Sequence, residues 1–224
     1  MVFETKFKGS YCILNVFLDY GEKIIAEPGS MISIRGDVEI STSTRGIFKA
    51  LKRTLLGGEN FFLNTYTSKS NSIISLAPRL PGDIEIVEVN NPLLIQSTSF
   101  LAAQENIDID TKFGGLKSFF ASEGFFFLKL NGFGQAAIAS FGGIYKIELR
   151  HGEKITVDTG HIVAFDETLN YSIRTFGNIK STLLGGEGLV CDFTGPGRIF
   201  IQTRNYPDFI KWIRNLVPKQ TGSK

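Results

Sequence analysis

The sequence predicts an all-β protein made of three tandem short double-stranded β-helix (jelly-roll-like) units, followed by a C-terminal α-helix. The main observation is a repeat. The segment 55–59 (LLGGE) returns at 183–187, and a weaker copy, 120–123 (FASE), stands between them. The glutamates that end these segments are 64 residues apart. A fixed period of this length indicates one structural unit used repeatedly, with each copy burying apolar surface against the next.

Strands are expected on both sides of a small-residue turn in every copy. Each copy has a β-branched or leucine-rich run, a turn of small residues and a second apolar run, which predicts strand, tight turn, strand. The aligned segments are 24–31, 93–100 and 155–162. The next strand alternates apolar and polar residues, as a strand with one solvated face does. Its three copies are 38–41, 107–110 and 169–172.

A hairpin is expected after each of the last two repeated glutamates. In the second copy an apolar run reaches Asn131-Gly132, a strong two-residue hairpin signal, and returns at 136–139. In the third copy, 189–193 turns at 195–197 and returns at 198–202. Further strands at 83–89 and 144–149 join the copies.

Helical segments are predicted at the same point of each copy and at the C-terminal end. The first copy carries an insert at 46–54 whose apolar residues fall on one helical face, which predicts a short helix; 113–118 and 176–181 predict about one helical turn each. A longer apolar face runs through 207–217, between Pro207, which suits a first helical turn, and Pro218, which ends the helix.

One domain, 1–224, is predicted, because no linker rich in Pro, Ser or charge separates the copies. The repeats span about 5–78, 79–142 and 143–206, with the helix at 207–217. The chain has 20 Phe. A buried Phe removes about 150–250 Å² from water, so phenylalanine is expected to dominate the interior.

Composition limits the functional classes. The net charge of +2 is too small to indicate a polyanion partner by itself. Cys12 and Cys191 lie in apolar strands and are expected to be buried free thiols. The N-terminus lacks the apolar region of a signal peptide, and no apolar run is long enough to span a bilayer. A cytoplasmic location is therefore predicted.

Residues for catalysis or metal binding are sparse. His151 and His161 replace Tyr20 and Ser30 of the first copy, so they are outside the repeated framework and are expected to be surface or hydrogen-bonded residues. The stretch 132–137 fits a loose G-x-G-x-x-A pattern, but a dinucleotide site needs a helix there and a strand is expected. No Walker loop, nucleophile elbow or His-activated thiol is visible. The sequence predicts no catalytic residue, metal site, cofactor or small-molecule substrate, and hence no enzyme.

Two sets of charged residues are candidates for interactions. Lys49, Lys52 and Arg53 in the insert could dock on an anionic membrane surface or contact RNA phosphates, or the segment could simply cover the end of the barrel. Three basic residues give about 3 kcal/mol at a membrane, which an oligomer could reinforce by avidity. The repeated Glu59, Glu123 and Glu187 could bind cations or a basic partner. We favour a structural role in which they accept backbone N–H groups of the turn or pair with a neighbouring repeat, because recurrence is what a folding requirement produces.

The repeated Gly-Gly-Glu turn, the Gly-Glu-Lys segments at 21–23 and 152–154, and the ending 193–205 (FTGPGRIFIQTRN) together resemble the altered-inheritance-of-mitochondria protein 24 family. The resemblance covers nearly the whole chain. It implies three units similar to the subunit of the tryptophan RNA-binding attenuation protein, homotrimers that form a ring of nine units, and no established catalytic residues. Mitochondrial members of the family are linked to inner-membrane organisation.

We therefore predict a non-enzymatic ring-forming scaffold of unknown process, with a protein or membrane-surface partner. The alternative is an RNA-binding ring. Fold likeness alone does not decide between them.

Overall fold

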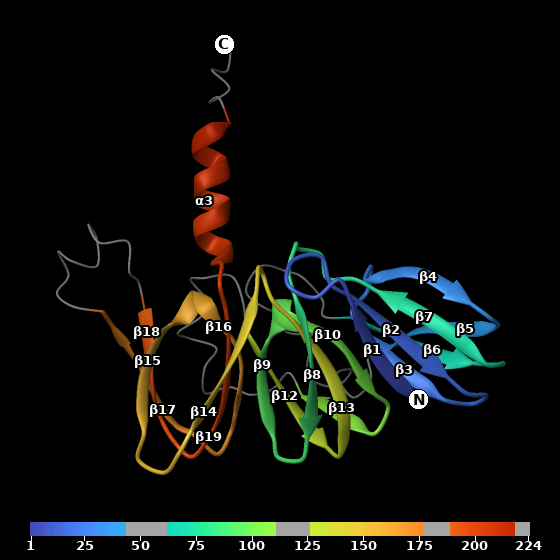
Figure 1. The fold of residues 1–224 in the computed structure, drawn as a ribbon, viewed down its shortest axis with the longest axis horizontal. Coiled ribbons are helices and arrows are strands. Elements are labelled where there is room, and N and C mark those ends of the chain that lie inside the picture. The colour runs from blue at the N-terminus through green and yellow to red at the C-terminus, as the bar shows by residue number, and fades with distance from the viewer. Residues whose placement is uncertain (44–61, 111–125, 177–188, 218–224) are drawn as a thin grey trace.

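The computed structural model describes residues 1–43, 62–110, 126–176 and 189–217. These residues form nineteen strands, two short 3-10 turns and one α-helix (Figure 1). The predicted all-β class with a C-terminal helix is confirmed.

The strands recur in the same order along the chain. The first repeat contains β1 (Val2–Lys6), β2 (Ile13–Leu18), β3 (Lys23–Ala26), β4 (Met31–Arg35), β5 (Val38–Ser43), β6 (Leu63–Ser68) and β7 (Ser72–Leu76). The second contains β8 (Ile84–Val89), β9 (Leu93–Gln96), β10 (Phe100–Gln104), β11 (Ile107–Asp110), β12 (Phe127–Gly132) and β13 (Gly134–Ala139). The third contains β14 (Ile144–Leu149), β15 (Lys154–Asp158), β16 (Ile162–Asp166), β17 (Asn170–Thr175), β18 (Leu189–Thr194) and β19 (Gly197–Gln202). Apart from the additional β1, each repeat contributes six strands.

Four sheets share these strands between repeats. We number them I to IV: sheet I is β1-β2-β7-β4, sheet II is β5-β6-β3-β10-β13-β8, sheet III is β11-β12-β9-β16-β19-β14, and sheet IV is β15-β18-β17. Each six-stranded sheet takes three strands from one repeat and three from the next. Consecutive repeats are thus joined through main-chain hydrogen bonds as well as through side chains.

The predicted hairpins are wrong. β12 and β13 are separated by the single residue Phe133, yet β12 pairs with β11 and β9 in sheet III while β13 pairs with β10 and β8 in sheet II. β18 and β19 separate in the same way, into sheets IV and III. Gly132 and Gly134 have φ of 125° and 148°, where a side chain would be strained. The glycine signal therefore marks a corner at which the chain crosses between sheets.

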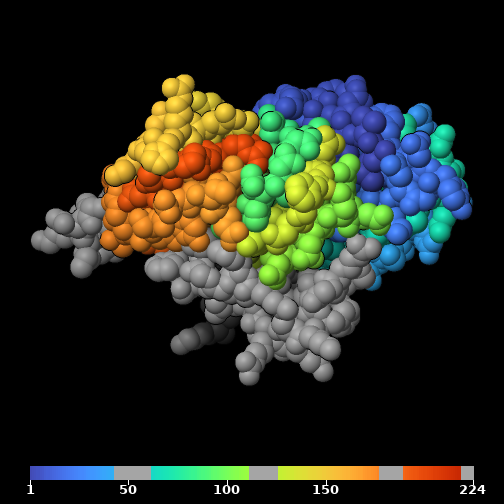
Figure 2. All heavy atoms as spheres, turned by 90° about the horizontal axis from the view of Figure 1, so that it is seen from below, coloured from blue at the N-terminus to red at the C-terminus, as the bar shows by residue number. Residues whose placement is uncertain are grey.

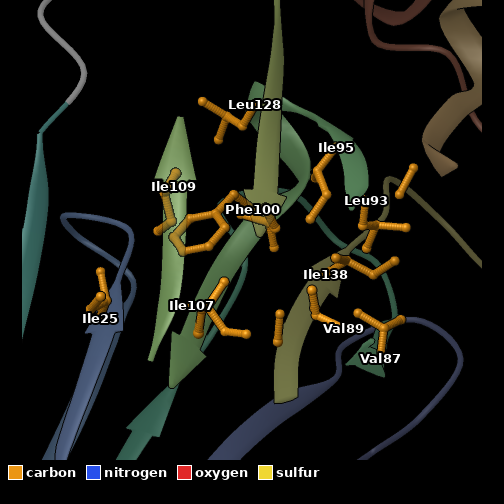
Figure 3. Close-up of a cluster of buried hydrophobic side chains, with 14 of the residues drawn as sticks. Ile25, Val87, Val89, Leu93, Ile95, Phe100, Ile107, Ile109, Leu128 and Ile138 are labelled. Atoms are coloured by element: carbon orange, nitrogen blue, oxygen red, sulfur yellow. The ribbon is translucent and has the colours of Figure 1, made fainter. Parts of the chain in front are cut away.

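The core is continuous from repeat to repeat. Its largest cluster centres on the second repeat and includes Phe100, Ile107 and Leu128 (Figure 3). Ile25 enters this cluster from β3 of the first repeat (Figure 3). Phe200, from β19 of the third repeat, belongs to the same cluster. In Figure 2 the three repeats follow one another along the long axis as one body. Each repeat thus completes its neighbour's interior, as stacked repeats do.

Aromatic packing carries much of this interior. Phe127, Phe165 and Phe193 are fully or almost fully buried, and their rings meet edge to face with centroids 5.0 and 5.6 Å apart around Phe165. Phe100 and Phe200 are also among the largest buried side chains of the described residues. The expected role of phenylalanine in the core is seen at these five positions.

The helix α3 (Tyr206–Leu216) matches the predicted span 207–217 to within one residue at each end. The Asn205 side chain accepts a hydrogen bond from the Asp208 N–H, and Pro207 occupies the first turn, as at many helix starts. None of the residues of α3 is buried. No helix in the described parts of the chain has the length and apolar character needed to cross a bilayer.

Candidate assembly interface

One histidine is exposed and the other is hydrogen-bonded, as expected. His151 is exposed in the turn after β14, whereas His161 ends the short turn before β16 with its Nδ1 2.7 Å from the carbonyl oxygen of Gln202. Within the described ranges, no three His, Cys, Asp or Glu side chains gather closely enough to hold a metal ion.

Both cysteines are buried free thiols, as predicted. Burial raises the pKa of the Cys12 thiol to about 11 and that of the Cys191 thiol to about 12. Both thiols are therefore protonated at neutral pH, and a protonated thiol is a poor nucleophile.

The charged residues that the sequence suggests for interactions are not among the residues that the structure describes. Lys49, Lys52 and Arg53 lie outside the described residues, and so do Glu59, Glu123 and Glu187. Their proposed roles stay predictions.

Consecutive repeats are joined by one recurring strand pair. β3 of the first repeat pairs antiparallel with β10 of the second, with Ala26 opposite Ala102 and Ile25 opposite Ala103. The Glu27 N–H extends this ladder by donating to the Leu101 carbonyl at 2.9 Å. The second and third repeats are joined in the same register. There, β9 pairs with β16, Ile95 lies opposite Ala164, and Leu94 lies opposite Phe165.

The next members of this series pair with no strand of another repeat among the described strands. β15 is the third-repeat equivalent of β3 and β9, and it stands at the edge of sheet IV, paired only with β18. β4 is the first-repeat equivalent of β10 and β16, and it stands at the edge of sheet I, paired only with β7. The chain therefore has two open edge strands, β4 and β15. They are equivalent to the two strands that pair with each other at every boundary between repeats.

A shared irregularity confirms that β4, β10 and β16 are equivalent. The register shifts by one residue at Ile32 in β4, at Leu101 in β10 and at Val163 in β16. Leu101 and Val163 are fully buried, because each packs into the core of the preceding repeat. Ile32 has no preceding repeat and is 53% exposed, and Met31 beside it is 41% exposed. Edge strands normally avoid such apolar exposure.

The other edge strand, β15, takes part in a polar network on the outer face of sheet IV. The Thr156 hydroxyl of β15 donates to Asp192 Oδ1 at 2.6 Å, and Arg174 holds the same carboxylate through Nε and Nη2 at 2.5 and 3.1 Å. Thr156 stands where Ile25 and Leu94 stand in the earlier repeats. Ion pairing with Arg174 keeps the pKa of Asp192 below its usual range, so the network is charged at neutral pH.

Sequence reasoning found the repeat but not these two edges. The alignment of 24–31 with 93–100 and 155–162 already contained the signal, since it places β4 and β15 in the series. Which strands pair across a repeat boundary became known only from the sheet order.

Comparisons with known proteins agree with this architecture. The sequence profile of a family described as "Mitochondrial biogenesis AIM24" matches residues 3–204. An uncharacterized protein of Streptococcus pyogenes serotype M6 is 27% identical over 220 residues, which cover 94% of this chain and 88% of that protein. The crystal structure of a protein from Streptococcus pyogenes superposes with a TM-score of 0.79 at 25% identity, over 96% of this chain and 99% of that chain.

Proposed function

The chain belongs to the mitochondrial biogenesis AIM24 family, and we propose that it acts as a non-enzymatic scaffold whose copies join head to tail into a closed ring. The observation that carries this proposal is the pair of open edges, β4 and β15. Each is the equivalent of a strand that pairs across a repeat boundary elsewhere in the same chain.

The internal joints give the register of the intermolecular one. Ser33 of one copy lies opposite Val157 of its neighbour, Ile34 opposite Thr156, and Arg35 opposite Ile155. These pairs follow from Ala102 opposite Ala26 and Ala164 opposite Ile95. Ile32 then enters the core of the neighbouring third repeat, just as Leu101 enters the core of the first repeat and Val163 that of the second within one chain. Burying a fully exposed isoleucine contributes about 1.5–3 kcal/mol. Because Ile32 is 53% exposed, burying the rest of it contributes about half of this, in addition to the main-chain hydrogen bonds.

Head-to-tail contacts use two different surfaces, so they close into a ring or continue as a filament, depending on the rotation at each joint. The joint proposed here repeats one that the chain already makes twice, which gives every unit an equivalent position. Three copies, the number that the family resemblance implies, supply nine units.

Light scattering on size-exclusion fractions tests the proposal. At micromolar concentration we expect three times the chain mass of 24.8 kDa. Ile32→Lys places a charge in the joint and should give monomers. Phe133→Lys is the matched control, because Phe133 is also an exposed apolar residue (72%) but lies on neither edge. A wild-type monomer, or an Ile32→Lys variant that still assembles, would contradict the ring.

The partner of this scaffold is proposed to be a protein or a membrane surface, engaged through Lys49, Lys52 and Arg53. Lipid-vesicle flotation of a variant neutralised at these three positions, compared with the wild type, tests the membrane version. Equal recovery of the two proteins would remove it. RNA retention that weakens as salt is raised would instead favour the RNA-binding alternative.

A further inference from the structure

The helix α3 leaves the body of the protein. In Figure 1 it stands above the sheets, and only its first turn lies near them. Its attachment is local, through the Phe141 and Phe209 rings, which meet edge to face with centroids 5.1 Å apart. Beyond this contact Trp212, Leu216 and Val217 are each at least 56% exposed. The distal turns thus present apolar surface that no described residue covers.

The two faces of α3 differ sharply. At 3.6 residues per turn, the apolar side chains share one face and the polar ones the other. The apolar face consists of Tyr206, Phe209, Ile210, Trp212, Ile213 and Leu216. The polar face consists of Asp208, Lys211, Arg214 and Asn215. Amphipathic helices that lie in a membrane interface have this arrangement, with Trp, Phe and Leu opposite Lys and Arg.

Charge gives a reason to choose lipid as the occupant of the apolar face. Between residues 209 and 217 Lys211 and Arg214 are basic and no residue is acidic, whereas Asp208, the acidic residue of α3, stands in its first turn. Arg204 adds a cation at the base of the helix, where it lines an open hollow of about 330 Å³ together with Trp212. A purely apolar groove on a partner protein would offer these basic side chains no ion pair, whereas anionic lipid headgroups would pair with them.

We propose that α3 binds the surface of an anionic lipid bilayer, lying along it with Trp212 and Leu216 at the boundary between headgroups and acyl chains. The proposal uses residues other than Lys49, Lys52 and Arg53. The inference rests on the proposed ring only for strength, because three helices on one assembly bind by avidity where a single short helix binds weakly.

Trp212 is the one tryptophan of the chain, so its fluorescence reports on α3 alone. The test uses full-length protein with vesicles of phosphatidylcholine and phosphatidylserine, and with vesicles of phosphatidylcholine only. We expect an emission blue shift with the anionic vesicles, quenching by lipids that carry a spin label on the acyl chain, and recovery of the protein in the floating fraction.

Two adjacent residues supply a matched pair of variants. Leu216→Glu and Asn215→Glu add the same charge to the same helical turn, the first on the apolar face and the second on the polar face. Leu216→Glu should bind anionic vesicles at least about tenfold more weakly than Asn215→Glu, since only the first loses the burial of an apolar side chain. Equal binding by the two variants would overturn the proposal.

Other outcomes are equally decisive. A Trp212 emission that is already blue-shifted without lipid and changes with protein concentration would show that another copy covers the helix, and would overturn the proposal. An absence of vesicle binding by assembled protein would also overturn it. Light scattering on the same samples separates the two ideas: a monomer that still binds anionic vesicles supports the lipid site while it refutes the ring.

Discussion

Arg198 holds Asp166 through three nitrogen atoms. Its backbone N–H donates to Oδ2 at 2.8 Å, Nε donates to both carboxylate oxygens, and Nη2 donates to Oδ1 at 2.8 Å. The guanidinium also donates to the Glu88 carbonyl at 3.3 Å. Asp166 and Arg198 belong to the third repeat and Glu88 to the second, so this cluster fastens one repeat to the next.

The first prediction concerns this ion pair. Arg198→Ala should lower the free energy of unfolding by about 3 kcal/mol, because it leaves the buried Asp166 carboxylate without its partner. Urea unfolding followed by circular dichroism measures the change. Arg174→Ala removes an exposed Arg–Asp pair of similar geometry and is the control, for which we expect no change beyond experimental error. A similar loss in both variants would show that burial is not the cause.

A second prediction concerns pH and Glu27. Burial raises the pKa of Glu27 to about 6 from 4.5, against the opposing effect of Arg79, whose Nε lies 3.0 Å from Oε1. The folded state therefore binds a proton more tightly than the unfolded state. The contribution of Glu27 to stability is complete below pH 4.5 and is lost as pH rises through about 6.

Glu27→Gln tests this linkage. The variant copies the buried Gln96, which occupies the equivalent place in the second repeat. It should be more stable than the wild type by about 1–2 kcal/mol at pH 8, and the difference should shrink as pH falls from about 6 to 4.5. Urea unfolding of both proteins across this range gives the comparison. A constant difference would mean that Glu27 does not titrate as its burial implies.

A third prediction concerns thiol reactivity. Because Cys12 and Cys191 are 1% exposed and protonated at neutral pH, neither should react with an aromatic disulfide reagent in the native state at pH 8. Both should react within minutes in guanidinium chloride. Rapid native labelling of one equivalent would show that one of the two strands opens locally.

A fourth prediction tests the intermolecular register. In a variant with Ile34→Cys and Thr156→Cys, oxidation should link chains covalently, because these residues lie directly opposite each other across the proposed joint. The control combines Ile34→Cys with Lys154→Cys, because Lys154 stands two residues before Thr156 in β15, on the same face. Non-reducing gels should show linked chains for the first pair and few for the second. The reverse result would mean that the joint has another register.

Local patterns in the sequence located the elements well. Alternating residues at 38–41 and 107–110 became β5 and β11, and the apolar face bounded by Pro207 and Pro218 became α3. These predictions succeeded because side-chain period and capping residues act within a few residues of chain.

Pairing was harder to predict. Asn131-Gly132 carries a strong hairpin signal, but β12 and β13 belong to different sheets. A glycine pair fixes where the chain can bend. It does not fix the sheet that the following strand joins, because that depends on apolar surface supplied by residues far away in the sequence.

By itself the sequence determined that one unit is used three times and where most strands lie. It also determined that the two thiols are buried among apolar residues and that a helix ends the fold. Only the tertiary structure decided that each repeat lends three strands to its neighbour's sheet, and hence that β4 and β15 are left at opposite ends of the series. The physical reason is that strand order depends on burial summed over both faces of a sheet. The buried Leu101 and the exposed Ile32 differ in this burial, although the local sequence treats them alike.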